Sequence, residues 1–319
     1  MSGPTLIASA RSALQAALRG DQRVRVLGED VTAGGPFGLT KTLVKEFGTA
    51  RICNTPISEG AIMGVAIGLA LGGERPFVDL MFCDFLTAAS DQLFNHAAKI
   101  NFMSGGRYNV PLTVWTIGGA GTRWGAQHSQ RLDGWLTQVP GLKVLAPASA
   151  AAAANAIEAA FDDPDPVVVI ADRALLYRKD ELPGDGDSPW NTRTVRAGRD
   201  MTVVATGRLV HLALEAGQKS DTDIEVLDLQ RLAPLDITHI LESVERTAKL
   251  LVLHDEAATG GFAASLSAAV YDNAFAALDA PIRRLTSPPT PVPAAPNLED
   301  AYLLDVDDIA AAMKELATL

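Results

Sequence analysis

The sequence contains little cysteine and no long apolar run. Its 319 residues include two cysteines, Cys53 and Cys83, which are too few for a disulfide scaffold or a cysteine-rich metal site and fit a reducing cytoplasm. Apolar stretches such as residues 61–71 are much shorter than the roughly 18–20 residues that span a bilayer. The N-terminal segment lacks a basic start followed by an apolar core, so no secretory signal is predicted. We therefore expect a cytoplasmic protein with no membrane partner.

Basic residues are also in deficit. Lys and Arg total 27 against 38 Asp and Glu, which leaves a formal net charge of −11. Phosphate backbones are bound by clustered Lys and Arg, so this balance argues against a nucleic-acid partner. The 48% hydrophobic and 20% charged content is typical of a globular protein with a sizeable core. The acidity is compatible with docking to a basic protein.

Helix-like and strand-like segments alternate along the chain, and the strands are apolar throughout. Strand-like segments cover residues 24–28, 76–82, 112–117 and 167–172, with helical spacing of apolar residues between them. Strands that are apolar on both faces are typical of parallel sheets buried between helices. The sequence therefore predicts an α/β fold in which mostly parallel sheets are covered by helices.

A change of composition divides the chain in two. Residues 181–196 are rich in Pro, Gly and Asp, and the strand–helix alternation restarts after them. A chain of 319 residues also exceeds the length of one typical domain. We expect one α/β domain over residues 1–180, a linker over 181–196 and a second α/β domain over 197–319.

The segment TPISEGAIMGVAIGLALGG (55–73) is the most informative part of the sequence. Ser58 is a good helix N-cap, and Glu59 follows it in the first turn. Gly60, Gly64, Gly68 and Gly72 lie four residues apart and so share one helical face. Interior glycine costs about 1 kcal/mol relative to alanine, which indicates that another backbone packs closely on this face. From residue type alone, the favoured interpretation of Glu59 is a carboxylate stabilised by the helix dipole.

The pattern of Glu59 with Gly64 and Gly68 resembles that of thiamine-diphosphate enzymes. The surrounding sequence is similar to the beta subunits of pyruvate, branched-chain 2-oxo acid and acetoin dehydrogenases, which combine a transketolase-like pyrimidine-binding domain with a transketolase C-terminal-like domain. The resemblance covers nearly the whole chain, with specific motifs at VLGEDV (26–31), DQLFNHAAK (91–99), AQHSQ (126–130), PGLKVLAP (140–147), DPVVVIADRALLYR (165–178) and NLEDAYLLDV (297–306).

The resemblance implies roles for four residues. Glu59 would hydrogen-bond to a ring nitrogen of the aminopyrimidine and favour its imino tautomer, whose nitrogen removes the thiazolium C2 proton intramolecularly. Phe85 would pack against the aminopyrimidine ring, and Ile57 would contact the same ring. His128, in a glycine-rich loop, would handle protons or orient the acyl intermediate and the incoming lipoyl group. Core packing for Phe85 and a solvated imidazole for His128 are the alternatives.

A structural monovalent cation, potassium, is a further implication of the resemblance. Its ligands would be the carbonyl oxygens of Leu112, Ala160 and Phe161 with the carboxylates of Asp163 and Asp165. Oxygen ligands suit a hard cation. A solvated acidic turn explains the two carboxylates equally well.

The motif that binds the diphosphate through Mg²⁺ in this family is missing. Gly184-Asp185-Gly186 has the required residues, but it lies in the proline-rich linker rather than between a strand and a helix. A phosphate-binding Gly-Lys-Ser/Thr loop and a dinucleotide fingerprint are absent as well. The resemblance therefore implies that an alpha subunit holds Mg²⁺ and the diphosphate, within a heterotetramer of two alpha and two beta chains. A lipoylated acyltransferase would be the second partner.

The substrate remains open between a small 2-oxo acid and acetoin. Phe85 and the segments TSPPTPVP (286–293) and GRLVHLA (207–213) resemble those of acetoin dehydrogenases. Pyruvate, a branched-chain 2-oxo acid and a specialised biosynthetic complex are alternatives. So are a non-catalytic assembly module and a single-chain transketolase-like enzyme. Ala88 and the TRW segment (122–124) depart from the family pattern and indicate a modified pocket.

Overall fold

The first sheet has seven strands and is parallel except at one edge. The computed structural model describes residues 3–179, 182–184 and 186–319. The strand order is β10-β5-β6-β4-β3-β1-β2, and only β10 runs antiparallel to its neighbour. The strands are β1 (Val24–Gly28), β2 (Ile52–Asn54), β3 (Arg75–Phe82), β4 (Thr113–Gly118), β5 (Lys143–Leu145), β6 (Val167–Asp172) and β10 (Arg231–Ala233).

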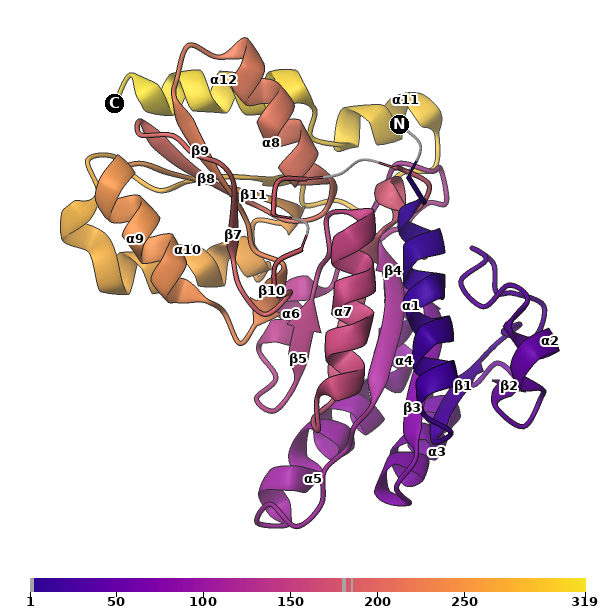
Figure 1. Cartoon of the computed structure of the whole chain (residues 1–319). Helices are drawn as coiled ribbons and strands as arrows, with labels where there is room; N and C mark the ends of the chain where they lie inside the picture. Colours follow the sequence, from indigo (N-terminus) through magenta and orange to yellow (C-terminus); the bar gives the residue numbers. More distant parts are fainter. Residues whose placement is uncertain (1–2, 180–181, 185) are drawn as a thin grey trace.

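Helices cover both faces of this sheet, and alternate strand residues point to them. On one face α1 (Leu6–Gly20) and α7 (Ala150–Asp162) lie side by side (Figure 1) and pack on Val167 and Val169. Val168 and Ile170 belong to the opposite core. Helices α3 (Glu59–Leu71), α4 (Leu86–Asp91) and α5 (Ala98–Met103) contribute to that core. Because both faces are buried, the strands carry apolar residues on both sides.

The second sheet has five strands in the order β12-β11-β8-β9-β7, with β7 antiparallel to β9. Helices α8 and α12 contribute to the core on one face, and α9 and α10 to that on the other. The elements are β7 (Arg193–Arg196), β8 (Met201–Ala205), α8 (Arg208–Lys219), β9 (Ile224–Asp228), α9 (Ile237–Thr247), β11 (Leu250–Ala257), α10 (Phe262–Ala274), β12 (Arg283–Ser287) and α12 (Val306–Ala317). The predicted α/β class with two mostly parallel sheets is confirmed.

The structure differs from the expected division of the chain in two respects. The linker expected over 181–196 ends in strand β7, whose Arg193 lies 2.9 Å from the buried carboxylate of Asp228. Strand β10 follows the linker in sequence but pairs with β5 of the first sheet. The second half of the chain thus completes the first sheet, which the local pattern of a three-residue strand could not predict.

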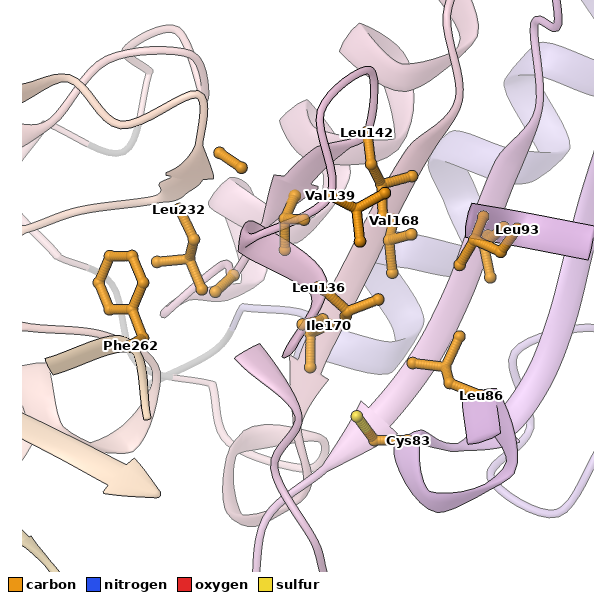
Figure 2. Close-up of a cluster of buried hydrophobic side chains, with 14 of the residues drawn as sticks. Cys83, Leu86, Leu93, Leu136, Val139, Leu142, Val168, Ile170, Leu232 and Phe262 are labelled. Carbon is orange, nitrogen blue, oxygen red and sulfur yellow. The ribbon is translucent and has the colours of Figure 1, made fainter. Parts of the chain in front are cut away.

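The apolar core is continuous between the domains. Figure 2 shows Leu232 and Phe262, from the second half of the chain, near Leu136 of the short helix α6 (Asp133–Thr137), and all three are fully or almost fully buried. Burying large side chains on both sides of a contact stabilises it by roughly 1.5–3 kcal/mol per residue. The two domains therefore share one apolar core cluster.

The remaining described helices are short. They are α2 (Leu43–Phe47), the 3₁₀ turns at Cys83–Phe85, Arg173–Leu175 and Phe275–Ala277, a π-helical segment at Gln92–Ala97, and α11 (Pro296–Tyr302). Within the described residues, no helix combines the length and apolar character needed to cross a bilayer.

Candidate active site

The carboxyl ends of the parallel strands bring the predicted site residues to one edge of the first sheet. Glu29 directly follows β1, and the turn that ends at Phe85 follows β3. The loop after β4 contains His128, and Arg173 directly follows β6. Ligands of open α/β sheets bind outside this edge, so the topology places these side chains where a ligand site is expected.

Glu59 begins helix α3, and a backbone contact ties its segment to the end of β1. The amide of Thr55 donates to the carbonyl of Gly28 at 3.0 Å. Ser58 occupies the N-cap position as predicted, but its hydroxyl makes no capping hydrogen bond. The first amides of α3 therefore remain available, together with the partly exposed Glu59 carboxyl group, to a group that approaches the helix end.

A second carboxyl group lies close to Glu59. Burial raises the pKa of Glu29, and the neighbouring Asp30 and Glu59 carboxylates raise it further. Like charges that share a site favour retention of a proton by one of them. The edge thus carries an acidic pair that can hold a proton. Glu29 was not identified from the sequence, although it follows a predicted strand.

Aromatic rings surround the imidazole of His128. Its ring centroid lies 4.9 Å from that of Phe82 and 5.6 Å from that of Phe85, both in edge-to-face geometry. The indole of Trp124 lies 6.1 Å away. Phe37 packs on both Phe82 and Trp124 at 5.4 and 6.3 Å. The structure therefore brings the predicted residues Phe85 and His128 together and adds three aromatic neighbours.

Buried polar contacts hold the His128 loop in place. The guanidinium of Arg173 donates to the backbone carbonyl of His128 and stacks 4.8 Å from the Phe82 ring centroid. The side chain of Gln130 donates to Asp84 Oδ1 at 2.7 Å, which connects the loop to the turn carrying Phe85. The position of the imidazole is thus fixed from β3 and β6 together.

The glycine face of α3 is open in this chain. A Cβ atom at Gly60 would lie 3.4 Å from the Ala88 carbonyl, whereas one at Gly68 would meet no atom of the described residues within 4 Å. The helix is apolar on all sides, yet Val65 is 56% exposed and Leu71 44% exposed. The closely packed second backbone expected from these glycines is therefore found only at Gly60. Ile57, just before the helix, is 72% exposed.

The acidic turn proposed for potassium is already neutralised by a lysine. The ammonium group of Lys143 lies 2.6 Å from Asp163 Oδ1 and 3.1 Å from Asp165 Oδ2. The carbonyl of Phe161 accepts a hydrogen bond from Arg75, and that of Leu112 accepts one from the Val167 amide at 2.9 Å. Ala160, the fifth predicted ligand, is buried in the core beside α1. These contacts count against the potassium site, which stays a prediction.

Of the Gly-Asp-Gly sequence in the linker, Asp185 lies outside the described residues, and Gly184 and Gly186 are exposed. Arg173, Phe82 and Trp124 were not identified as site residues from the sequence. Arg173 and Phe82 directly follow or end a predicted strand, which is a usable signal. For Trp124, the only signal in the sequence was that its segment departs from the family pattern.

The fold and the site define a class: a two-domain α/β protein whose first sheet carries a carboxyl pair and an aromatic-lined histidine at its carboxyl edge. Residues 3–179 match the family model of the transketolase pyrimidine-binding domain, and residues 191–309 match that of the transketolase C-terminal domain. A "split gene transketolase, inactive beta4 tetramer" shares this fold, with a TM-score of 0.79 at 22% identity over 100% of this chain and 99% of that one.

Curated relatives cover nearly the whole chain. The beta subunit of acetoin:2,6-dichlorophenolindophenol oxidoreductase from Bacillus subtilis is 42% identical over 95% of this chain and 94% of its own. The pyruvate dehydrogenase E1 beta subunit of Gracilaria tenuistipitata is 38% identical over 96% and 97%. The 2-oxoisovalerate dehydrogenase beta subunit of Bacillus subtilis is 36% identical over 99% of both. The chain belongs to this transketolase-like family of dehydrogenase beta subunits.

Proposed function

We propose that this chain is the beta subunit of a thiamine-diphosphate-dependent dehydrogenase that decarboxylates a 2-oxo acid or cleaves acetoin and transfers the acyl unit to a lipoyl group. The observation that carries the proposal is the juxtaposition at one sheet edge of the Glu29–Glu59 carboxyl pair and the aromatic-lined His128. This edge belongs to the domain that matches the pyrimidine-binding family model.

The residues at this edge suit a flat aromatic ring with polar nitrogens. Phe85 offers an aromatic side chain, and Ile57 offers an exposed apolar one. Glu59 supplies a carboxyl group for a ring nitrogen, and Glu29 beside it favours retention of one proton by the pair. When bound, thiamine diphosphate would supply the carbon nucleophile that attacks the substrate carbonyl. In that complex Glu59 holds the ring-directed proton, and Phe85 and Ile57 orient the ring.

His128 is placed for proton transfer at the substrate. Its imidazole is partly exposed and is held by the backbone contact of Arg173. An imidazole with a fixed orientation can donate or accept a proton near neutral pH. We assign to His128 the handling of protons during acyl transfer, and to the surrounding rings the exclusion of water from that proton.

A second chain is needed to complete the proposed site. Ile57, Val65 and Leu71 are 72%, 56% and 44% exposed, and a helix that is apolar on all sides is normally buried. We propose that an alpha subunit covers the glycine face of α3 and holds Mg²⁺ and the diphosphate. The assembly would be a cytoplasmic heterotetramer of two alpha and two beta chains that docks to a lipoylated acyltransferase.

The proposal is tested by comparing the chain alone with the chain co-expressed with a candidate alpha subunit from the same organism. Calorimetry should detect thiamine-diphosphate binding in the presence of Mg²⁺ only for the assembly. Reduction of 2,6-dichlorophenolindophenol should then follow addition of pyruvate, acetoin or a branched 2-oxo acid. Tight cofactor binding by the isolated chain contradicts the shared site. An assembly that binds cofactor but turns over none of these substrates supports an assembly module instead.

A further inference from the structure

Trp124 occupies an unusual position on the His128 loop. Its indole packs 5.2 Å from the Phe82 ring centroid and 6.1 Å from the His128 imidazole, yet 49% of the residue is exposed. The guanidinium of Arg173 lies 5.8 Å from its ring centroid. One side of the indole thus contacts the aromatic cluster, and the rest faces the open edge. The side chain is a wall beside the imidazole rather than part of the buried core.

The backbone on both sides of Trp124 is held in the left-handed region. Gly125 has a φ of 72°, and Arg123, which has a side chain, has a φ of 67°. Non-glycine residues in this region persist only where surrounding contacts hold them, and they concentrate at functional sites. A Cβ at Gly125 would lie 3.3 Å from Ala294 Cβ, so the second domain also limits the space behind the loop.

The contacts that hold this conformation come from helix α11 of the second domain. Glu299, whose side chain is fully buried, accepts hydrogen bonds from the amides of Gly121 and Arg123 at 2.8 and 3.0 Å. The Arg123 guanidinium lies 2.8 Å from Glu299 and 2.5 Å from Asp300. A buried carboxylate with two amide donors and an arginine forms strong, directional bonds. The loop and the indole are therefore fixed by tertiary contacts and are not a mobile surface tip.

We propose that Trp124 is a specificity-determining residue of the proposed reaction: its indole forms the wall of the acyl pocket next to His128 and restricts the substrate to a small acyl group. The inference rests on the function proposed above, in which the acyl carbon is handled beside His128. For an acyl group handled beside His128, the half-exposed indole 6.1 Å away would limit the room for a branched chain. A methyl group, as in pyruvate or acetoin, requires less of that space.

The test is the ratio of kcat/KM for pyruvate or acetoin to kcat/KM for 3-methyl-2-oxobutanoate, measured by dye reduction with the chain assembled with its alpha subunit. Wild type should favour the small substrates. Trp124→Ala should shift the ratio towards the branched acid by at least about tenfold, since a few methylene contacts alter selectivity by that order. Trp124→Phe, which keeps an aromatic wall, should shift it by less than about threefold.

Trp190→Ala is the matched control, because it removes the same side chain near Lys143 at the linker and should leave the ratio unchanged. A ratio that stays constant in Trp124→Ala while pyruvate or acetoin is still consumed overturns the inference and leaves the proposed function intact. Equal shifts in Trp124→Phe and Trp124→Ala, or a wild-type preference for the branched acid, also overturn it. Absence of turnover with every substrate in the wild-type assembly overturns the proposed function itself.

Discussion

The loop between β4 and α6 begins at the open carboxyl edge of the first sheet and ends in a buried cluster of charged residues between the domains. This cluster, called the joint below, contains Arg131, Asp133, Asp172, His254 and Glu256. At the edge, Trp124 is 49% exposed and Ile57 72% exposed. At the joint, Arg131 lies 2.8 Å from Asp133 and 3.7 Å from Asp172, and His254 is 1% exposed between Asp133 and Glu256. The same loop thus borders a site at the sheet edge that other molecules can reach and a charged cluster at the joint that is buried within the chain.

The difference lies in how the charges are compensated. Burial lowers the pKa of Arg131, but the Asp133, Asp172 and Asp255 carboxylates more than offset it, and the net shift is upward. Asp255 in turn lies 2.7 Å from Arg208. At the edge, by contrast, burial and then the neighbouring Asp30 and Glu59 carboxylates raise the pKa of Glu29. Carboxylates thus compensate Arg131 within the chain, whereas the edge leaves Glu29 beside two other acids, which suits proton chemistry.

The largest effect is expected from replacing Glu59, the carboxylate of the open edge. Glu59→Gln should lower decarboxylation or acetoin cleavage by the assembly at least about a thousandfold, equivalent to roughly 4 kcal/mol in the barrier. The reason is that the amide cannot exchange the ring-directed proton. Dye reduction measures the rate, and the exposed Glu158→Gln on α7 is the control that should retain wild-type turnover. Near-normal turnover of Glu59→Gln would refute the assignment.

The joint is tested by removing its central cation. Arg131→Ala removes the guanidinium beside the buried Asp133 and Asp172 carboxylates, so the chain should lose about 3–5 kcal/mol of stability. The thermal midpoint should fall by about 6–12 °C. Arg199→Ala removes a cation whose side chain is 91% exposed beside Asp223, and should cost less than about 1 kcal/mol. Similar losses in both variants would contradict the contrast between joint and surface.

A pH series separates paired from unpaired buried acids. Burial raises the pKa of Asp79 in β3 to about 6, despite a hydrogen bond from the Met81 amide. The folded state therefore binds this proton more tightly than the unfolded state. The stability it contributes is complete below the unfolded pKa near 3.8 and is lost as the pH rises through about 6. Two pKa units correspond to about 3 kcal/mol.

The stability of Asp79→Asn relative to wild type should consequently increase by about 2–3 kcal/mol between pH 4 and pH 7. The difference between the two thermal midpoints, measured at each pH in the same buffer series, isolates this group from the other carboxylates. A difference that does not change with pH would show that the buried Asp79 carboxylate is compensated within the fold.

The smallest expected effect concerns potassium. Because Lys143 already contacts both Asp163 and Asp165, replacing Na⁺ by K⁺ at constant ionic strength should move the thermal midpoint by less than about 1 °C. Lys143→Gln should lower the midpoint in either salt, which shows that the measurement reports on this cluster. A clear increase in the thermal midpoint of the wild type in K⁺ would support the predicted cation site.

Much of the fold followed from local patterns. Fully apolar strands between helical segments predict a parallel sheet covered on both faces, and Val167 to Ile170 do point alternately to the two cores. Strand β10 could not be predicted in this way, because three residues carry no periodicity and their partner β5 lies far away in sequence. On the glycine face of α3, the described residues of this chain bring a second backbone close only at Gly60; the packing of a partner subunit on the rest of this face stays a prediction.

The sequence by itself determined the two α/β domains, the family and the identity of Glu59, Phe85 and His128 as candidates, since these depend on residue order and spacing. Only the tertiary structure decided which side chains surround them. Glu299 holds Arg123 from 176 residues away, and Lys143 reaches the acids proposed for potassium. Such contacts arise from the packing of one domain or element on another, and no local pattern of residues records them.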